Sequence, residues 1–199
     1  MCGTIYLQIN HQRHHLFLFD NNHINSICII AAMTSMRTMF HTQGYRLPYL
    51  TEPIICSRED AWLGEGYYFW YEEQDAIFWG QNGKKAYKKY IVYKAVIDCQ
   101  GILDTVFNEK HYLLWYRAVE KIADDIFKKS GRKATIPEIN NIIKMNKIWE
   151  SVSGIMFQDI PNNQQVNKVI NLYYRKRIQL VCFEMNIIHT FTHHFEAEC

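Results

Sequence analysis

The residue types and spacings that could support chemistry are concentrated in one block. Gly64 and Gly66 flank a single residue, and the aromatic run 67–70 follows them directly. Glycine lets a backbone turn where a side chain would clash, and aromatic residues favour strands, so the block predicts a tight turn that leads into a buried strand. So many aromatic residues are expected to line an interior or a pocket.

The spacing within this block is specific. Ala76 and Trp79 follow Tyr68 by eight and eleven residues. The pattern resembles the second motif of the ADP-ribosyltransferase superfamily, especially its poly-ADP-ribose polymerase and diphtheria-toxin branch. The resemblance implies an α+β fold with an ADP-ribosyltransferase-like split β-sheet core and peripheral helices, and NAD as the substrate. It also implies that Tyr68 is catalytic and that Gly66, Tyr67, Tyr68 and Trp79 bind NAD.

Two further positions of the family's site match residues far from this block. A histidine at the end of an early strand would be His41, 27 residues before Tyr68. The resemblance makes His41 catalytic and, with Thr42, part of the NAD site. The family often has a glycine and a small hydroxyl residue after this histidine, whereas this chain has Thr42 and Gln43. The third catalytic position, normally a glutamate near the start of a late strand, is Gln179. An amide cannot take a proton, so chain-forming polymerase activity is not expected.

Other charged residues offer alternatives to this assignment. Glu65, inside the glycine turn, is a second candidate carboxylate, although a solvated turn residue is the simpler interpretation. Glu184 would face the opposite side of the strand from Gln179. Guanidinium groups pair well with phosphate, so four arginines could meet the NAD pyrophosphate or be surface charges. They are Arg46, Arg58, Arg175 and Arg177.

The spacing of histidine and cysteine predicts no metal site. Five histidines, His11, His14, His15, His23 and His41, lack a carboxylate at fixed helical spacing, and the six cysteines form no Cys-x-x-Cys pair. The first residues lack the basic and apolar regions of a secretory signal, and no apolar stretch reaches the ~20 residues of a membrane helix. A reduced cytoplasmic protein without membrane contact is therefore expected. The even number of cysteines leaves an oxidised, secreted effector open.

Hydrophobic periodicity predicts the elements that must position these side chains. Strands are expected at 38–42, 67–70, 87–98, 178–183 and 187–191, and helices at 72–80, at 108–129 and from a capping box at Thr135. Residues 87–98 are apolar on both faces, which predicts a central strand. Gly80 is expected to end the first helix, and residues 81–85 are expected to form a turn.

The composition indicates one globular domain. The 199 residues are 48% apolar and 15% aromatic, which excludes a disordered chain. A net charge of +2 gives no bulk electrostatic case for nucleic acid or an anionic membrane. Residues 1–35 differ in composition and are expected to be a variable or poorly ordered extension. Residues 36–199 are expected to form the ADP-ribosyltransferase-like domain.

Three functions follow from these observations. The leading hypothesis is a bacterial-type mono-ADP-ribosyltransferase, with a toxin-like, immunity or modification role, that transfers ADP-ribose from NAD to an unknown protein or nucleic-acid acceptor. The alternative is a catalytically inactive module of the same fold that binds NAD, ADP-ribose or a protein partner. A third hypothesis is a related fold that acts on nucleic-acid ends, which would need a basic groove. The residues do not indicate an oligomeric state.

Overall fold

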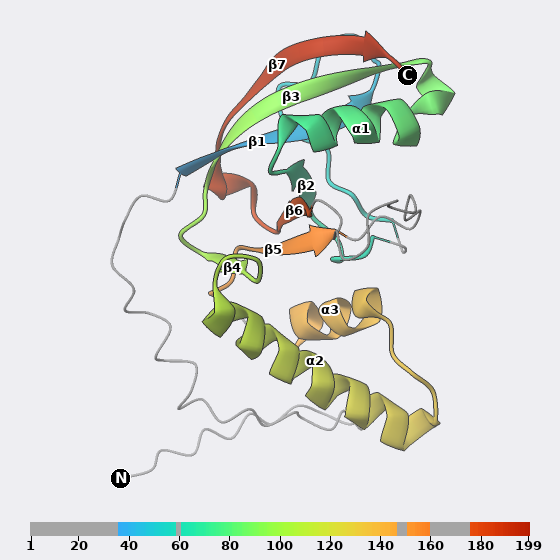
Figure 1. Cartoon of the computed structure of the whole chain (residues 1–199), viewed down its shortest axis with the longest axis vertical. Helices are drawn as coiled ribbons and strands as arrows, with labels where there is room; N and C mark the ends of the chain where they lie inside the picture. Colours follow the sequence, from blue (N-terminus) through green and yellow to red (C-terminus); the bar gives the residue numbers. More distant parts are fainter. Residues whose placement is uncertain (1–35, 59–60, 147–150, 160–175) are drawn as a thin grey trace, which may run out of the picture. The chain divides into compact units, whose positions relative to one another are not determined.

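The computed structural model of the chain describes residues 36–58, 61–146, 151–159 and 176–199 (Figure 1). All of them belong to one compact unit, Ala32–Cys199. The strands are β1 (Met36–Gly44), β2 (Tyr67–Trp70), β3 (Lys89–Asp98), β4 (Ile102–Asp104), β5 (Gly154–Asp159), β6 (Arg177–Cys182) and β7 (Ile188–Glu198). The α-helices are α1 (Glu73–Gly83), α2 (Glu109–Ser130) and α3 (Ile136–Met145). The extension predicted at 1–35 lies outside the described residues.

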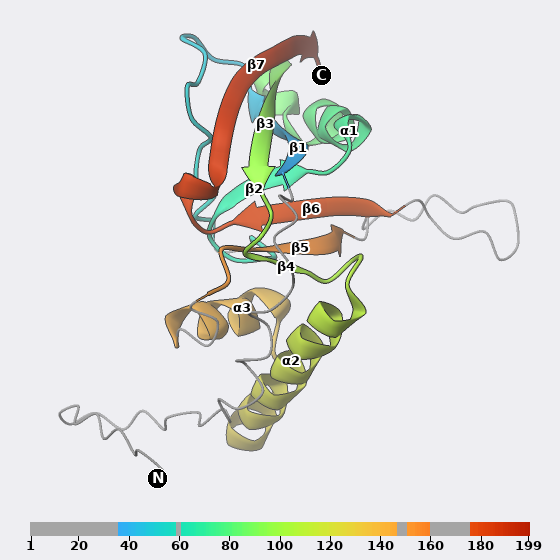
Figure 2. The same cartoon turned by 90° about the vertical axis from the view of Figure 1, so that its left-hand side faces the viewer.

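The described strands form one seven-stranded sheet in the order β4-β5-β6-β2-β1-β3-β7. The pairs are antiparallel except for β4 with β5, which run parallel. Strand β3 lies between β1 and β7, so the prediction of a central strand is confirmed (Figure 2). Together with the three helices, this mixed sheet agrees with the α+β class.

The sheet is joined at its middle by a very short contact. Strands β1 and β3 pair along their length, from Met36 opposite Asp98 to Gly44 opposite Tyr90. Strands β1 and β2, in contrast, are in register only where Phe40 lies opposite Trp70. Backbone groups on either side of this contact lack a ladder partner in the neighbouring strand, and buried backbone groups need another partner. The candidate site lies at this junction.

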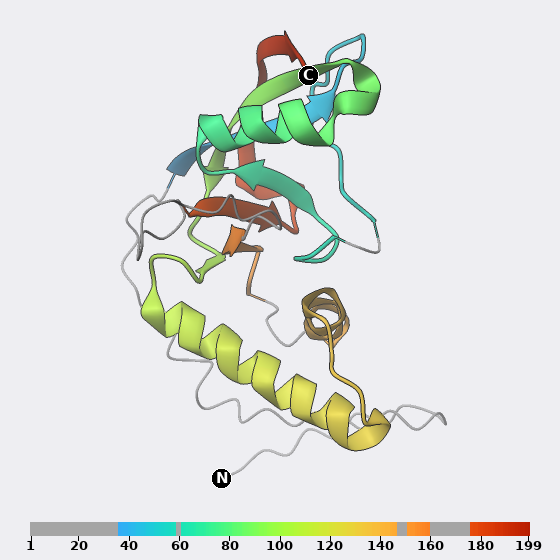
Figure 3. The ribbon, with the colours of Figure 1, turned by 45° about the vertical axis from the view of Figure 1, so that its right-hand side comes forward.

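Helix α1 follows β2 and packs against β1, β2 and β3 (Figure 3). Glu73 and Asp75 lie in its first turn, where the helix dipole favours acids. The prediction that Gly80 ends the helix is wrong, because α1 continues to Gly83. A Cβ atom at Gly80 would overlap the ring of Tyr90, so this glycine permits close helix-to-sheet packing. The prediction of a turn at 81–85 is wrong for residues 81–83, because these residues belong to α1.

Helix α2 begins and ends within one residue of its predicted bounds, and α3 begins at its predicted capping box. The side chain of Asn108 accepts hydrogen bonds from the first turn of α2, and Gly131 follows its last residue with a φ of 68°. The hydroxyl of Thr135 accepts from the backbone N–H of Glu138 at the start of α3. Strands β4 and β5 were not predicted. Among the described residues, no helix combines the length and apolar character needed to cross a bilayer.

Candidate functional site

A pocket of about 360 Å³ lies beside the junction of β1, β2 and β6. Its size is within the range of small-molecule sites. The described residues that line it are His41, Thr42, Gln43, Ile54, Ile55, Cys56, Ser57, Arg58, Ala61, Trp62, Tyr68, Trp70, Trp79, Lys84 and Gln179. All three predicted catalytic residues, and the predicted NAD-binding Thr42 and Trp79, are therefore brought to one place. Their roles stay predictions.

His41 connects the two halves of the sheet with its side chain. Its Nδ1 lies 2.8 Å from the backbone oxygen of Tyr68, and its Nε2 lies 3.1 Å from the amide nitrogen of Gln43. A carbonyl oxygen only accepts, so Nδ1 carries the hydrogen and Nε2 accepts from Gln43. The imidazole thus takes the place of a backbone ladder bond that β1 and β2 do not make.

The same environment keeps His41 uncharged. The side chain is buried, and burial lowers its pKa from 6.5 to about 4; the hydrogen bond to Tyr68 opposes this shift and the positive charge of Lys84 adds to it. At neutral pH the imidazole is neutral, with both nitrogens hydrogen-bonded. His41 can therefore orient groups around it, but it is a weak base.

Tyr68 holds the glycine turn in shape. Its hydroxyl donates to the backbone oxygen of Gly64 at 2.6 Å and accepts from the backbone N–H of Leu63 at 3.1 Å. Gly64 has a φ of 88°, a backbone conformation that residues other than glycine rarely adopt. The phenol is half-buried and lines the pocket, so its ring face is available beside the cavity while its hydroxyl is used by the turn.

Gln179 is held by a residue that the sequence analysis did not identify. The indole Nε1 of Trp62 donates to Oε1 of Gln179 at 2.7 Å. Because an indole N–H can only donate, the amide oxygen must face Trp62, and this sets the orientation of the amide. The amide nitrogen has no hydrogen-bond partner among the residues that the structure describes. Gln179 therefore offers the pocket a hydrogen-bond donor.

Aromatic rings form a wall of the pocket. Trp70 and Trp79 both line it, with ring centroids 6.1 Å apart. Trp79 comes from α1 and is half-buried, as a stacking surface for a flat ligand requires. Thr42 contributes little hydrogen bonding to the cavity, because its hydroxyl donates to the backbone oxygen of Ala76 in α1 at 2.8 Å.

Some predicted site residues are not at the pocket. Gly66 and Tyr67 do not line it: the Gly66 backbone pairs with Cys56, and Tyr67 packs on the hydrophobic cluster of the other sheet face. Glu65 is exposed and forms a 3.0 Å ion pair with Lys144, which agrees with the simpler interpretation of a turn residue. Glu184 is exposed in the loop after β6. Gly66 and Tyr67 shape β2 and do not contact the cavity.

The arginine and metal predictions have different outcomes. Arg58 lines the pocket, Arg46 is exposed, and the guanidinium of Arg177 lies over the ring of Trp70 at 5.6 Å; Arg175 is outside the described residues. Within the described part of the chain, no group of three His, Cys, Asp or Glu side chains could hold a metal ion. Four of the five clustered histidines lie outside that part.

Trp62 and Lys84 are among the lining residues with polar groups that were not predicted. Neither has a signal in the sequence beyond its position near the glycine turn or the end of α1, because the partners that give them a role are distant in the chain. Trp62 and Gln179 are 117 residues apart.

Comparison of the chain with protein-family models, with curated proteins and with solved structures found no match.

Proposed function

We propose that the pocket binds the nicotinamide half of NAD and that the protein transfers a single ADP-ribose unit to a macromolecular acceptor. One observation carries this proposal: His41, Gln179 and the pair Tyr68 and Trp79, which match three separate positions of the site of one enzyme superfamily, line one pocket. They come from β1, β2, β6 and α1, so their convergence does not follow from the local sequence. The narrow β1–β2 contact supports a split sheet of the ADP-ribosyltransferase type.

The chemistry required is the cleavage of a glycosidic bond. The bond between ribose C1′ and the pyridinium nitrogen breaks, nicotinamide leaves as a neutral molecule with the bonding electrons, an acceptor atom bonds to C1′, and the acceptor's proton passes to solvent. Tyr68 and Trp79 supply rings for the nicotinamide, and stacking orients it for departure. Gln179 donates a hydrogen bond to a ribose oxygen through its amide nitrogen. This residue cannot deprotonate a further ribose hydroxyl, so the reaction stops after one transfer.

Release of nicotinamide from labelled NAD tests the proposal. We expect release by the full chain and a loss of about 100-fold or more in Tyr68→Ala and in Trp79→Ala, because both variants lose groups that orient the reacting bond. Tyr116→Ala is the matched control: this tyrosine is exposed on α2, outside the pocket lining. Equal rates in all four proteins, or no release with any acceptor, would contradict the proposal.

A binding module without catalysis is the second candidate, and one observation favours it. Neither His41, which has a low pKa and two hydrogen-bonded nitrogens, nor the Gln179 amide is a good proton acceptor at neutral pH. A module predicts that calorimetry detects NAD binding, that Trp79→Ala weakens it, and that nicotinamide release stays at the uncatalysed rate. The release assay above separates the two functions.

A further inference from the structure

Cys56 places a thiol at the wall of the pocket. The residue is half-buried and lines the cavity, and its sulfur has no hydrogen-bond partner among the residues that the structure describes. Two backbone bonds fix its position: its N–H donates to the carbonyl oxygen of Gly66 at 2.8 Å, and its own carbonyl oxygen accepts from the N–H of Gly66 at 3.2 Å. A thiol that is fixed, partly exposed and unbonded is available for reaction.

The other described cysteines have different surroundings. Burial raises the pKa of the Cys99 thiol to about 11, and this thiol donates to the backbone oxygen of Ile97 at 3.7 Å. Burial also raises the pKa of Cys182, which lies in the core. Cys199 is exposed and does not line the pocket. Of the cysteines in the described part of the chain, only Cys56 faces the cavity.

An ammonium group lies close to the Cys56 thiol. Lys84 is half-buried and lines the same cavity. Burial lowers the pKa of Lys84 and the charge of Arg58 adds to this shift, whereas the charge of Cys56 opposes it, so the lysine and the cysteine are near enough to interact. The thiolate is the nucleophilic form of cysteine, and reactive thiols in proteins lie in partly exposed places beside cations. Cys56 has both features.

Gln179 gives an independent indication of a ligand beside this thiol. The residue is only 8% exposed, and its Oε1 accepts from Trp62. Its Nε2 lines the cavity without a hydrogen-bond partner among the described residues. A buried N–H group without a partner is unfavourable, so the cavity favours a ligand whose oxygen can accept this bond. Carboxylate and carbonyl oxygens can accept from Nε2 and from the Lys84 ammonium.

We infer that Cys56 is a modification site that exchanges with a small disulfide bearing carboxylate and amide oxygens, and that the attached group occupies the pocket. The Cys56 thiolate attacks one sulfur of the disulfide and forms a new S–S bond to it. The original S–S bond breaks, and the second sulfur leaves with the bonding electrons and takes up the proton that Cys56 released. Cys56 is thereby oxidised, and the released thiol is the reduced product.

Peptide-resolved mass spectrometry of the full chain tests this exchange without reference to NAD. The probes are oxidised glutathione, which carries carboxylate and amide oxygens, and cystamine, a disulfide that carries amines instead. The readout is the ratio of the Cys56 modification rates with the two probes, because this ratio cancels changes in the reactivity of the thiol itself. Cys199 serves as the exposed reference, and Cys182 should stay unmodified while the protein is folded.

Two substitutions should lower this ratio. Lys84→Gln removes the ammonium, and Gln179→Glu keeps an oxygen for Trp62 but replaces the unbonded N–H donor by a carboxylate oxygen. Each should lower the ratio at Cys56 at least about 10-fold, since hydrogen bonds to charged groups contribute about 10- to 100-fold in affinity. The ratio at Cys199 should not change. Lys85→Gln, an exposed neighbour outside the pocket lining, is the matched control.

Two results would overturn the inference. One is a Cys56 that stays unmodified by oxidised glutathione while Cys199 reacts. The other is a ratio at Cys56 that is the same in the wild type, Lys84→Gln and Gln179→Glu, because the pocket would then not recognise the attached group.

Occupation of the pocket is tested with the modified protein, and this step rests on the proposed function. After modification by oxidised glutathione, calorimetry should detect no NAD binding, and a thiol reductant should restore it. Cys199→Ser, which lacks the exposed thiol, should behave in the same way. Unchanged NAD binding by fully modified protein contradicts the occupation of the pocket. An absence of NAD binding before modification contradicts the proposed function and leaves the exchange at Cys56 intact.

Discussion

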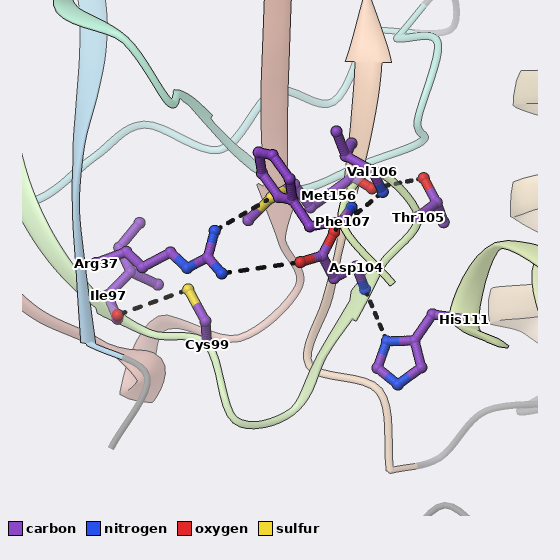
Figure 4. A network of polar contacts seen from close by, with 9 residues as sticks. All are labelled: Arg37, Ile97, Cys99, Asp104, Thr105, Val106, Phe107, His111 and Met156. Carbon is purple, nitrogen blue, oxygen red and sulfur yellow. Dashed lines mark hydrogen bonds and ion pairs between the residues drawn. The ribbon is translucent and has the colours of Figure 1, made fainter. Parts of the chain in front are cut away.

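Arg37 and Lys84 are both partly buried cations, yet their surroundings differ. Arg37 lies 3.8 Å from a carboxylate oxygen of Asp104 (Figure 4). Its guanidinium lies 5.6 Å from the ring centroids of both Tyr71 and Phe107. Lys84 faces a cavity and has no carboxylate beside it in the described part of the chain. One cation is surrounded by partners that the protein supplies. The other lines the pocket, where a bound anion would supply them.

The other polar groups around Arg37 are bonded in the same way. Asp104 also accepts from the backbone N–H groups of Val106 and Phe107, at 3.0 and 2.8 Å, while its own N–H donates to Nδ1 of His111 at 3.1 Å. These bonds join β4 to the turn before α2 and to the first turn of that helix (Figure 4). We call Arg37, Asp104 and His111 the Arg37 cluster. It stabilises a corner of the fold.

The difference in hydrogen-bond and charge partners between the Arg37 cluster and the pocket distinguishes a structural polar cluster from a candidate binding site. Buried polar groups in a stable fold are normally satisfied, and exceptions mark places with another task. In the pocket the exceptions are the ammonium of Lys84 and the amide nitrogen of Gln179, both of which are donors. The cavity is therefore suited to an acceptor-rich, anionic ligand. NAD, with its diphosphate and ribose oxygens, has that character.

Acidification should distinguish the two regions most strongly. His41 has a pKa of about 4 in the folded state against 6.5 in the unfolded chain, so the unfolded state binds a proton first as the pH falls. The stability present above pH 6.5 should decline by about 3 kcal/mol between pH 6.5 and 4 and then level off. Urea unfolding across this range measures it.

His41→Gln should remove most of this pH dependence. His111→Gln, in the Arg37 cluster, should alter it less, because burial lowers the pKa of His111 while Asp104 opposes the shift. Parallel curves for the wild type and His41→Gln would show that His41 is not the titrating group, and the account of a neutral imidazole at the pocket would be wrong.

Replacing each cation by methionine should change stability in opposite directions. Arg37→Met loses an ion pair and two cation–π contacts and should cost about 1–2 kcal/mol. Lys84→Met removes a repelled charge and should stabilise the empty protein by up to about 1 kcal/mol, as often follows when a binding residue is lost. Thermal unfolding of both variants checks the signs. A loss of stability in Lys84→Met would mean that this lysine has a structural partner.

The smallest expected effect is the loss of stability when a tryptophan that donates a hydrogen bond in the pocket is replaced by phenylalanine. Trp62→Phe keeps a ring for edge contact with Phe157 but loses the N–H that holds Gln179, so it should cost about 1 kcal/mol. Trp115 is the control, because its buried Nε1 has no hydrogen-bond partner among the described residues. Trp115→Phe should cost only the packing of the lost ring volume, with no hydrogen bond removed. Equal costs would show that the indole–amide bond adds nothing beyond packing.

The elements with local signals were predicted closely. Asn108 and Gly131 bracket α2, Thr135 caps α3, and the aromatic run forms β2, since caps and periodicity act within a few residues. The predictions failed where distant contacts decide. Gly80 continues a helix because it packs on Tyr90. The three-residue β4 pairs with β5, some 50 positions later, and neither strand has a pattern of its own.

The site shows the same division. A short motif and two matching positions indicated His41, Tyr68, Trp79 and Gln179, because these residue types suit the chemistry that the resemblance implies. The motif could not indicate that Gly66 pairs with Cys56 and leaves the cavity to its neighbours. It also could not indicate Lys84, whose significance depends on the charges around it.

By itself the sequence determined the classes of the main elements and which side chains are chemically capable, because propensities, caps and the identities of functional groups are local properties. The tertiary structure decided the rest: the cavity, the neutral state of His41 and the orientation of the Gln179 amide. Each depends on burial and on a partner from another strand or loop, as in the bond between Trp62 and Gln179. Desolvation and hydrogen-bond geometry arise only when distant segments pack together.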